Sequence, residues 1–167
     1  MRVQVEKAGR IALLRRGVEV WNDFRRGHPA YIVLNCTSLP GAELQHIDLH
    51  CVLLMQSDLR RANLNCASFE RSILRSSDFR GSDLRQANLD GADLCRADLS
   101  DADLREASLA SAFLKRTDLT GADLSTARGL TFEQICDAHG DDRTKLPRGM
   151  ERPATWATTL QVHRALG

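Results

Sequence analysis

A large apolar residue occupies every fifth position of the chain from residue 34 to residue 124. The nineteen positions of this series hold seventeen Leu and two Phe, Phe69 and Phe79. The residue two places earlier is small or β-branched, most often Ala, and the residue between the two is usually Asp, Asn or Ser. Five residues rotate an α-helix by about 500°, and on a flat strand an odd spacing sends alternate leucines to opposite faces. The period therefore predicts neither a helix nor a flat strand.

The period instead predicts a solenoid. Three extended residues place the small residue and the Leu inward and the residue between them outward, and the next two residues turn a corner. Repetition of this quintet winds coils that stack through strand-like hydrogen bonds about 4.8 Å apart. Glycines fall at four of these corners: Gly41, Gly81, Gly91 and Gly121. Stacked Leu and Ala side chains then fill the core, which leaves no interior cavity.

The outward positions indicate how many sides each coil has. They are polar in fifteen of the nineteen repeats, and the apolar exceptions are Val33, Leu53, Ile73 and Phe113. These four differ by multiples of twenty residues, and Asp93 fills the remaining place of that series. A four-sided coil of twenty residues brings them into one column, whereas a three-sided coil of fifteen residues scatters them. We therefore predict a four-sided β-helix of about five coils.

The repeated motif resembles that of a known family. Segments such as Ala92-Asp93-Leu94-Cys95-Arg96 are similar to the Ala-Asp/Asn-Leu-x-x quintets of the pentapeptide-repeat family, and the resemblance covers residues 32–127. Membership implies an all-β solenoid, namely a right-handed quadrilateral β-helix. It also implies that the outward Asp residues face solvent as ordinary surface side chains and do not form a ladder of metal ligands. The quintets at 37–41 and 52–56 depart from the motif.

The sequence before the repeats predicts a helical cap, residues 1–31. A solenoid leaves unpaired strand edges at its ends, and these stack into fibres unless they are covered. Residues 8–26 show an amphipathic pattern that Gly27 and Pro29 stop, which predicts one helix lying over the first coil. A basic amphipathic helix is also a form that lies on membrane surfaces, and we take the cap as the favoured interpretation.

The sequence after the repeats, residues 128–167, predicts a C-terminal cap and strap. Thr131 and Gln134 form a capping-box pattern that starts a short helix, and Gly140 ends it. An irregular stretch follows, and a second helical stretch is expected over residues 154–166.

Composition bears on location. The chain has 167 residues with 23 Lys and Arg, 22 Asp and Glu, and a formal net charge of +1. No apolar run approaches the ~20 residues of a bilayer span, and we expect no secretory signal at the start. Five cysteines are an odd number without CxxC spacing. They indicate reduced thiols in the cytoplasm rather than a disulfide framework.

The chain offers no set of residues that suggests catalysis. It has no Gly-rich phosphate loop, no HExxH motif and no Ser/His/Asp arrangement. His46, His50 and Cys51 are close in sequence but fall at or beside successive corners, so solvated side chains are expected there rather than metal ligands. We therefore expect no enzymatic activity, no cofactor, no metal and no small-molecule substrate.

The apolar outward positions are the candidate interface. With Met55 at the adjoining corner, the set is Val33, Leu53, Met55, Ile73 and Phe113. Monomers seldom leave such a patch bare, so either the chain's own C-terminal segment covers it, or a second copy or another protein does. The tail side chains that would cover it are Leu146, Met150, Trp156 and Leu160. Lys115 and Arg116, beside Phe113, would form a polar rim in either case.

The sequence thus favours a structural or protein-interaction module in the cytoplasm, with a protein partner or self-association and no membrane partner. The alternative is a DNA-mimicking modulator of gyrase or another topoisomerase, as in one branch of the family. Mimicry requires a continuous negative field, but residues 32–127 hold 14 acidic and 10 interspersed basic residues, a net charge of −4. Nucleic-acid binding is not expected, because no basic patch is interleaved with aromatic residues.

Overall fold

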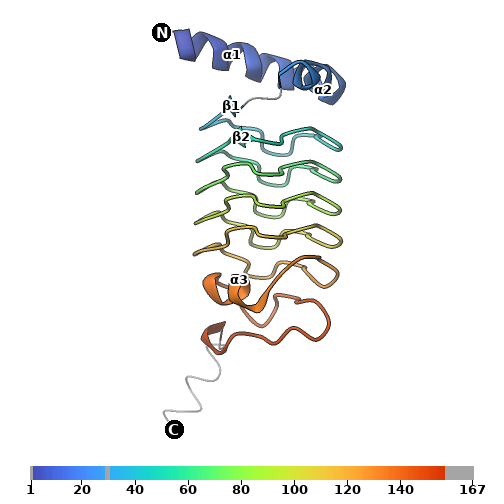
Figure 1. Cartoon of the computed structure of the whole chain (residues 1–167), viewed down its shortest axis with the longest axis vertical. Helices are drawn as coiled ribbons and strands as arrows, with labels where there is room; N and C mark the ends of the chain where they lie inside the picture. The colour runs from blue at the N-terminus through green and yellow to red at the C-terminus, as the bar shows by residue number, and fades with distance from the viewer. Residues whose placement is uncertain (1, 29–30, 157–167) are drawn as a thin grey trace.

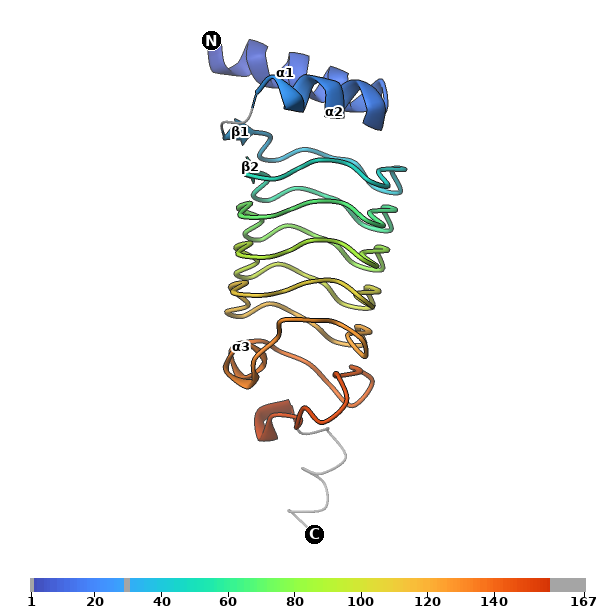
Figure 2. The same cartoon turned by 45° about the vertical axis from the view of Figure 1, so that its right-hand side comes forward.

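The computed structural model describes residues 2–28 and 31–156. Figures 1 and 2 show stacked coils with helices at the N-terminal end and a helix with irregular turns at the other end. The elements are α1 (Arg2–Arg15), α2 (Val18–Arg26), β1 (Ile32–Val33), β2 (Val52–Leu53), α3 (Phe132–Asp137) and the 3-10 helix η1 (Ala154–Trp156). None of the helices within these described ranges is long and apolar enough to cross a membrane.

Parallel pairing joins residues that lie twenty apart along the chain. Strand β1 pairs with β2 so that Val33 lies opposite Leu53. Isolated parallel bridges continue this register through the repeats, as far as the bridge from Ser108 to Arg128. Each side of a coil has only about three extended residues before the next corner, so most of the pairing consists of single bridges. The separation of twenty matches four quintets per coil and does not fit a fifteen-residue, three-sided coil.

The large residues of the five-residue series form the core. Leu64, Leu84 and Leu104 are completely buried, as their predicted inward placement requires. Phe69 and Phe79 are also completely buried, and their rings meet edge to face with centroids 5.8 Å apart. Burial of each such side chain stabilises the fold by roughly 1.5–3 kcal/mol, which makes the stacked column of side chains the main source of stability.

Hydroxyl groups occupy several of the small inward positions. The Oγ of Ser72 donates to the carbonyl oxygen of Leu49 (2.6 Å) and accepts from the N–H of Val52 (3.1 Å). The Oγ1 of Thr117 donates in the same way to the carbonyl oxygen of Leu94 (2.8 Å). A buried hydroxyl is costly without a partner, so these backbone bonds explain how Ser and Thr replace Ala inside the coil.

The second corner residue of each quintet has a left-handed backbone. At eighteen consecutive corners, from Cys36 to Gly121, φ lies between 51° and 70°. Only four of these residues are glycines, although the left-handed region costs other residues on the order of 1 kcal/mol each. The others are unbranched at Cβ, for example Arg96 with φ 60° and Ser111 with φ 56°. The corners are therefore a conformational cost that the buried core offsets.

The prediction of one helix over residues 8–26 is wrong. The structure has two helices, α1 and α2, separated at Gly17, where φ is 116°. That conformation is open to glycine but interrupts an α-helix, and the amphipathic pattern alone did not reveal the break. Helix α2 ends at Arg26, next to the predicted stop at Gly27.

Helix α2 lies against the first coil. Trp21 is completely buried, and its Nε1 donates to the carbonyl oxygen of Asp48 at 2.6 Å. The side chain of Asn22 donates to the carbonyl oxygen of His46 (3.0 Å) and accepts from the N–H of Asp48 (2.8 Å). The helix thus supplies partners to backbone groups at the edge of the coil that has no coil above it.

Helix α3 begins with the predicted capping box. The Oγ1 of Thr131 accepts from the N–H of Gln134 (3.3 Å), and the Oε1 of Gln134 accepts from the N–H of Thr131 (2.7 Å). The helix ends at Asp137 rather than continuing to Gly140, because the chain becomes extended and His139 pairs with Asp118.

The expected second helical stretch, residues 154–166, is described only at its beginning. Ala154–Trp156 form a 3-10 helix, and residues 157–166 lie outside the described residues. Trp156 is buried, and its Nε1 donates to the carbonyl oxygen of Ala138 at 3.0 Å.

Candidate interaction surface

The apolar outward residues lie in one column on one side of the coils. Val33 pairs with Leu53, Leu53 with Ile73, Ile73 with Asp93, and Asp93 with Phe113. A corner after each inward Leu turns the chain onto the next side, so a period of twenty residues, which contains four corners, returns the chain to the same side one coil further on. We call Val33, Leu53, Ile73 and Phe113 the apolar column.

Exposure within the apolar column increases sharply at its C-terminal end. Val33, Leu53 and Ile73 are half-buried, as is Met55 at the adjoining corner, whereas Phe113 is 60% exposed. Each coil is about 4.8 Å from the next, so the apolar column extends along the stack. The exposed ring of Phe113 lies at its C-terminal end.

The described part of the C-terminal tail does not cover Phe113. Trp156 is buried against Ala138 and Gly140, and Leu146 and Met150 pack against the core cluster. The ring of Phe113 stays exposed, so the described tail residues do not provide the cover that the first of the two alternatives requires at this position. Leu160, the fourth residue of that alternative, lies outside the described residues.

Asp93 interrupts the apolar column, and its carboxylate is paired with the guanidinium of Arg75. The Nε of Arg75 lies 2.6 Å from Oδ2 of Asp93, and the N–H of Cys95 donates to Oδ1 at 3.2 Å. Burial raises the pKa of Asp93, but hydrogen bonds from Cys95 and Arg75 outweigh it and leave that pKa below its usual value. The carboxylate therefore stays ionised and paired, and Arg75 has its partner within the column.

A hollow of about 500 Å³ lies between Phe113 and α3. Its lining comes from the last coils and from the helix: Cys95, Ser111, Ala112, Phe113, Leu114, Lys115, Thr131, Glu133, Gln134 and Asp137. Helix α3 is held there because Nε2 of Gln134 donates to the carbonyl oxygens of Leu109 (3.0 Å) and Ala112 (2.8 Å). We call this hollow the Phe113 groove. The sequence pattern does not predict this groove, because the position of α3 depends on these long-range bonds.

A second hollow, of about 630 Å³, adjoins the first at the corner of the same side. It is lined by Arg75, Ser76, Cys95, Arg96, Lys115 and Arg116, so Cys95 and Lys115 line both hollows. Arg96, Lys115 and Arg116 are exposed and make no ion pair or side-chain hydrogen bond with any described residue. We call these three residues the basic corner. Lys115 and Arg116 were predicted beside Phe113, whereas Arg96 was not; its spacing of twenty residues from Arg116 is the signal that places it at the same corner.

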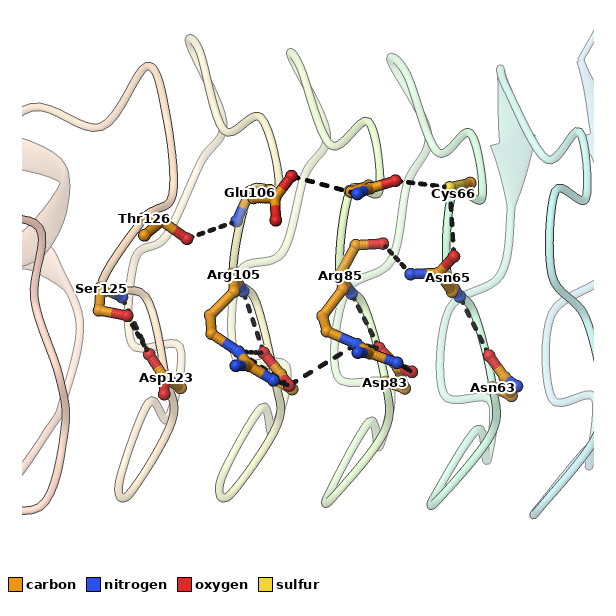
Figure 3. Close-up of polar contacts among 12 residues, drawn as sticks. Asn63, Asn65, Cys66, Asp83, Arg85, Arg105, Glu106, Asp123, Ser125 and Thr126 are labelled. Carbon is orange, nitrogen blue, oxygen red and sulfur yellow. Dashed lines mark hydrogen bonds and ion pairs between the residues drawn. The ribbon is translucent and has the colours of Figure 1, made fainter.

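Arginines on the opposite side of the coils are paired instead. Figure 3 shows Arg85 and Arg105 stacked one coil apart, each against a carboxylate of its own coil. The guanidinium NH2 of Arg85 lies 2.6 Å from Oδ2 of Asp83, and that of Arg105 lies 2.6 Å from Oδ2 of Asp103. The hydrogen bond to Arg85 is the main cause that lowers the pKa of Asp83. The unpaired cations of the basic corner therefore differ from the paired arginines of this side.

His46, His50 and Cys51 do not form a metal site. Instead, Nδ1 of His50 lies 2.5 Å from Oδ1 of Asp48, and its Nε2 lies 2.9 Å from NH2 of Arg25. Arg25 also donates to the carbonyl oxygen of His50 at 2.6 Å. Among the residues that the structure describes, no three His, Cys, Asp or Glu side chains are grouped to hold a metal ion. His50 therefore links α2 to the first coil.

Comparison with known proteins identifies the repeat. The model of the pentapeptide repeats matches residues 53–91 and 87–125, with eight copies. A pentapeptide repeat protein from the thylakoid lumen of Arabidopsis thaliana is 25% identical over 71% of this chain and 81% of its own, with a TM-score of 0.60. No curated protein sequence matches this chain.

Two further solved structures show lower overall agreement. A pentapeptide repeat protein from Nostoc PCC 7120 is 29% identical over 71% of this chain and 77% of its own, with a TM-score of 0.47. QnrB1, a plasmid-mediated fluoroquinolone resistance protein, is 13% identical over 80% of this chain and 66% of its own, with a TM-score of 0.37. Of these three structures, the Arabidopsis protein has a TM-score above 0.5 and bears on the fold.

Proposed function

Because the chain belongs to the pentapeptide-repeat family, we propose that it is a rigid, non-catalytic module that binds another protein through the apolar column. The exposure of Phe113 carries this proposal. An aromatic ring that is 60% exposed, in register with Leu53 and Ile73, provides the apolar centre that an interface needs. The packed core of Leu and Ala offers no interior site for catalysis.

The same proposal extends to the architecture and location. We propose a right-handed, four-sided β-helix of about five coils over residues 32–127, capped by residues 1–31 and by residues 128–167. The contacts of Trp21 with the first coil and the pairing of His139 with Asp118 support caps at the two ends. All five cysteines are free, which supports a reducing compartment, and we propose the cytoplasm.

Modulation of gyrase by DNA mimicry is the less favoured function. A mimic needs continuous negative charge, yet Arg60 and Arg80 alternate with the carboxylates of their side, and Asp58 and Asp78 are paired with them at 2.8 and 2.6 Å. A gyrase supercoiling assay tests this. We expect no inhibition at micromolar protein, and inhibition at that concentration would replace the proposed function with topoisomerase modulation.

Substitution of Phe113 tests the proposed interface. Wild type, Phe113→Asp and the control Phe132→Asp are immobilised and exposed to lysate of the native host, and retained proteins are quantified by mass spectrometry. Phe132 is a suitable control because it is 46% exposed but lies on α3 outside the apolar column. We expect some host proteins to be retained by both wild type and Phe132→Asp but not by Phe113→Asp. Identical retention by all three, with unchanged elution volume and trypsin sensitivity, would show that the column binds nothing.

A further inference from the structure

We propose that the Phe113 groove and the basic corner together bind one segment of a partner protein, in which a large apolar side chain is followed by acidic side chains. The inference rests on the proposed function and adds the chemistry of the partner. It is carried by two adjoining hollows of different character. One lies beside an exposed aromatic ring, and the other is lined by Arg75 and by the three cations of the basic corner, which pair with no described residue.

The Phe113 groove provides the apolar half of the site. The ring of Phe113 is one wall, Ala112 and Leu114 belong to the buried inner positions beside it, and α3 lies on the other side. Its volume of about 500 Å³ lies within the range of ligand sites and exceeds what one large side chain needs. A Phe or Leu of the partner that enters the groove removes its own apolar surface and that of Phe113 from water.

The basic corner provides the anionic half. Arg96 and Arg116 occupy equivalent corners of successive coils, about 4.8 Å apart, and Lys115 precedes Arg116. Like charges at this spacing repel one another, and no carboxylate among the described residues is bonded to any of the three. Carboxylates of a partner remove this repulsion and gain charge-assisted hydrogen bonds. Cys95 and Lys115 line both hollows, so the two halves are continuous.

Acidic residues of α3 set the direction of the bound segment. Glu133 and Asp137 line the Phe113 groove on the side of the helix. Partner carboxylates on that side would meet like charge, whereas on the side of Lys115 and Arg116 they meet cations. The apolar side chain must therefore enter the groove with the acidic residues pointing away from α3 and toward the basic corner.

Charge complementarity disfavours the other occupants. Two copies joined through the same patch would bring two sets of the three cations close together. The tail, residues 157–167, contains Arg164 and no Asp or Glu, so it offers no acidic side chain to the basic corner. A nucleic acid would match the cations but not the apolar groove with Glu133 and Asp137 on its wall.

A labelled peptide tests the proposal directly on the full chain. The probe is a short fluorescein-labelled peptide that contains one Phe followed by three Glu, and binding is read by fluorescence anisotropy. Matched peptides carry Lys in place of Glu, or Ala in place of Phe. We expect the probe to bind in the micromolar range, the Lys peptide not to bind, and the Ala peptide to bind about tenfold more weakly. Raising the salt concentration to about 1 M should weaken binding of the probe, because salt screens the attraction between its Glu side chains and the basic corner.

Variants assign the binding to the site. We expect two variants to bind the probe about tenfold more weakly than wild type. They are Phe113→Ala and the double variant Arg96→Gln with Arg116→Gln. The matched control is Arg85→Gln with Arg105→Gln, which removes two paired arginines on another side and should leave binding unchanged. Circular dichroism of every variant shows whether it is folded before binding is compared.

Several outcomes would overturn the proposal. They are equal binding of the Glu and Lys peptides, equal loss in the control variant, or no binding of the probe at all. Displacement of the probe by a synthetic peptide of residues 157–167 would assign the groove to the tail, and tighter binding of duplex DNA through the same arginines would assign the corner to nucleic acid. If host proteins still depend on Phe113 while the probe fails, the partner chemistry is wrong and the proposed function stands. If the probe does not bind and no host protein depends on Phe113, the proposed function is also wrong.

Discussion

Trp21 of α2 donates a 2.6 Å hydrogen bond from its Nε1 to the carbonyl oxygen of Asp48, on the last side of the first coil. The ring is completely buried, so one side chain both fills the space below α2 and satisfies a backbone group at the open edge of the first coil. Because the other backbone groups of that edge have no coil above them, the stability of the N-terminal end depends on this helix.

Trp21→Ala should destabilise the protein by roughly 3–5 kcal/mol, since it leaves a large cavity and exposes the coil edge. We also expect aggregation, measured by light scattering, because an exposed strand edge pairs with other chains. Urea unfolding measures the loss of stability. Tyr31→Ala is the control, because Tyr31 is 57% exposed and its removal should change stability by less than about 0.5 kcal/mol. A loss below about 1 kcal/mol for Trp21→Ala would contradict the role of α2.

Leu99→Ala should cost about 2–5 kcal/mol of unfolding free energy, because Leu99 is completely buried in the stacked core. Leu53→Ala provides a matched control, since Leu53 is also a leucine but points outward and is half-buried. We expect the control to lose about 1 kcal/mol or less. Equal losses of stability for the two variants would contradict the inward placement of Leu99 and the outward placement of Leu53.

Much of the repeat region could be predicted because its pattern is local and periodic. One Leu in each quintet can reach the axis only if the chain turns a corner after it, so the inward placement of Leu64 and Leu104 follows from spacing alone. The register of Leu53 with Ile73 was also recoverable, because four apolar outward residues share a period of twenty.

The parts that were missed depend on contacts between distant segments or on costs spread over many residues. Gly17 breaks the N-terminal helix, but the amphipathic pattern continues across it, so the sequence did not separate α1 from α2. The left-handed corners at residues such as Arg96 were not expected, because the core offsets a strain that is small at each one. The Phe113 groove depends on the position of α3, which Gln134 holds through hydrogen bonds to the distant carbonyl oxygens of Leu109 and Ala112.

Gly129→Ala should destabilise the C-terminal end more than Gly149→Ala. Both glycines have a left-handed backbone, with φ of 74° and 86°, so both substitutions introduce the same type of strain. A Cβ at Gly129 would lie 2.8 Å from the backbone nitrogen of Ala110, whereas one at Gly149 would meet nothing within 4 Å. The additional overpacking at Gly129 should cost about 1–3 kcal/mol by urea unfolding. Equal losses would show that the backbone at Ala110 moves aside freely.

Acid should weaken the end of the coil stack where Asp123 and Asp141 lie. Burial raises the pKa of Asp123, but hydrogen bonds from Ser125 and the ammonium of Lys145 outweigh it and lower that pKa to about 2. Burial likewise raises the pKa of Asp141, and the N–H of Gly121, the guanidinium of Arg143 and the hydroxyl of Thr144 lower it to about 2.

These two carboxylates therefore contribute stability that is fully present above about pH 4, the pKa of the unfolded chain, and is lost as the pH falls toward 2. Their side chains are 21% and 27% exposed, so solvent screening reduces each contribution to the order of 1 kcal/mol. Urea unfolding of wild type, Asp123→Asn and Asp141→Asn between pH 6 and pH 2 measures it. We expect the variants to be less stable than wild type at pH 6 and to approach it at pH 2.

Asp142→Asn is the control for the acid series, because Asp142 is exposed and its carboxylate makes no hydrogen bond with the described residues. It should follow the wild-type pH profile throughout. Other paired carboxylates, such as Asp83 and Asp103, also lose their partners in acid, so the difference between variant and wild type is the measurement rather than the total loss. If that difference stays constant from pH 6 to pH 2 for both Asn variants, the hydrogen bonds to Lys145 and Arg143 do not stabilise the ionised carboxylates.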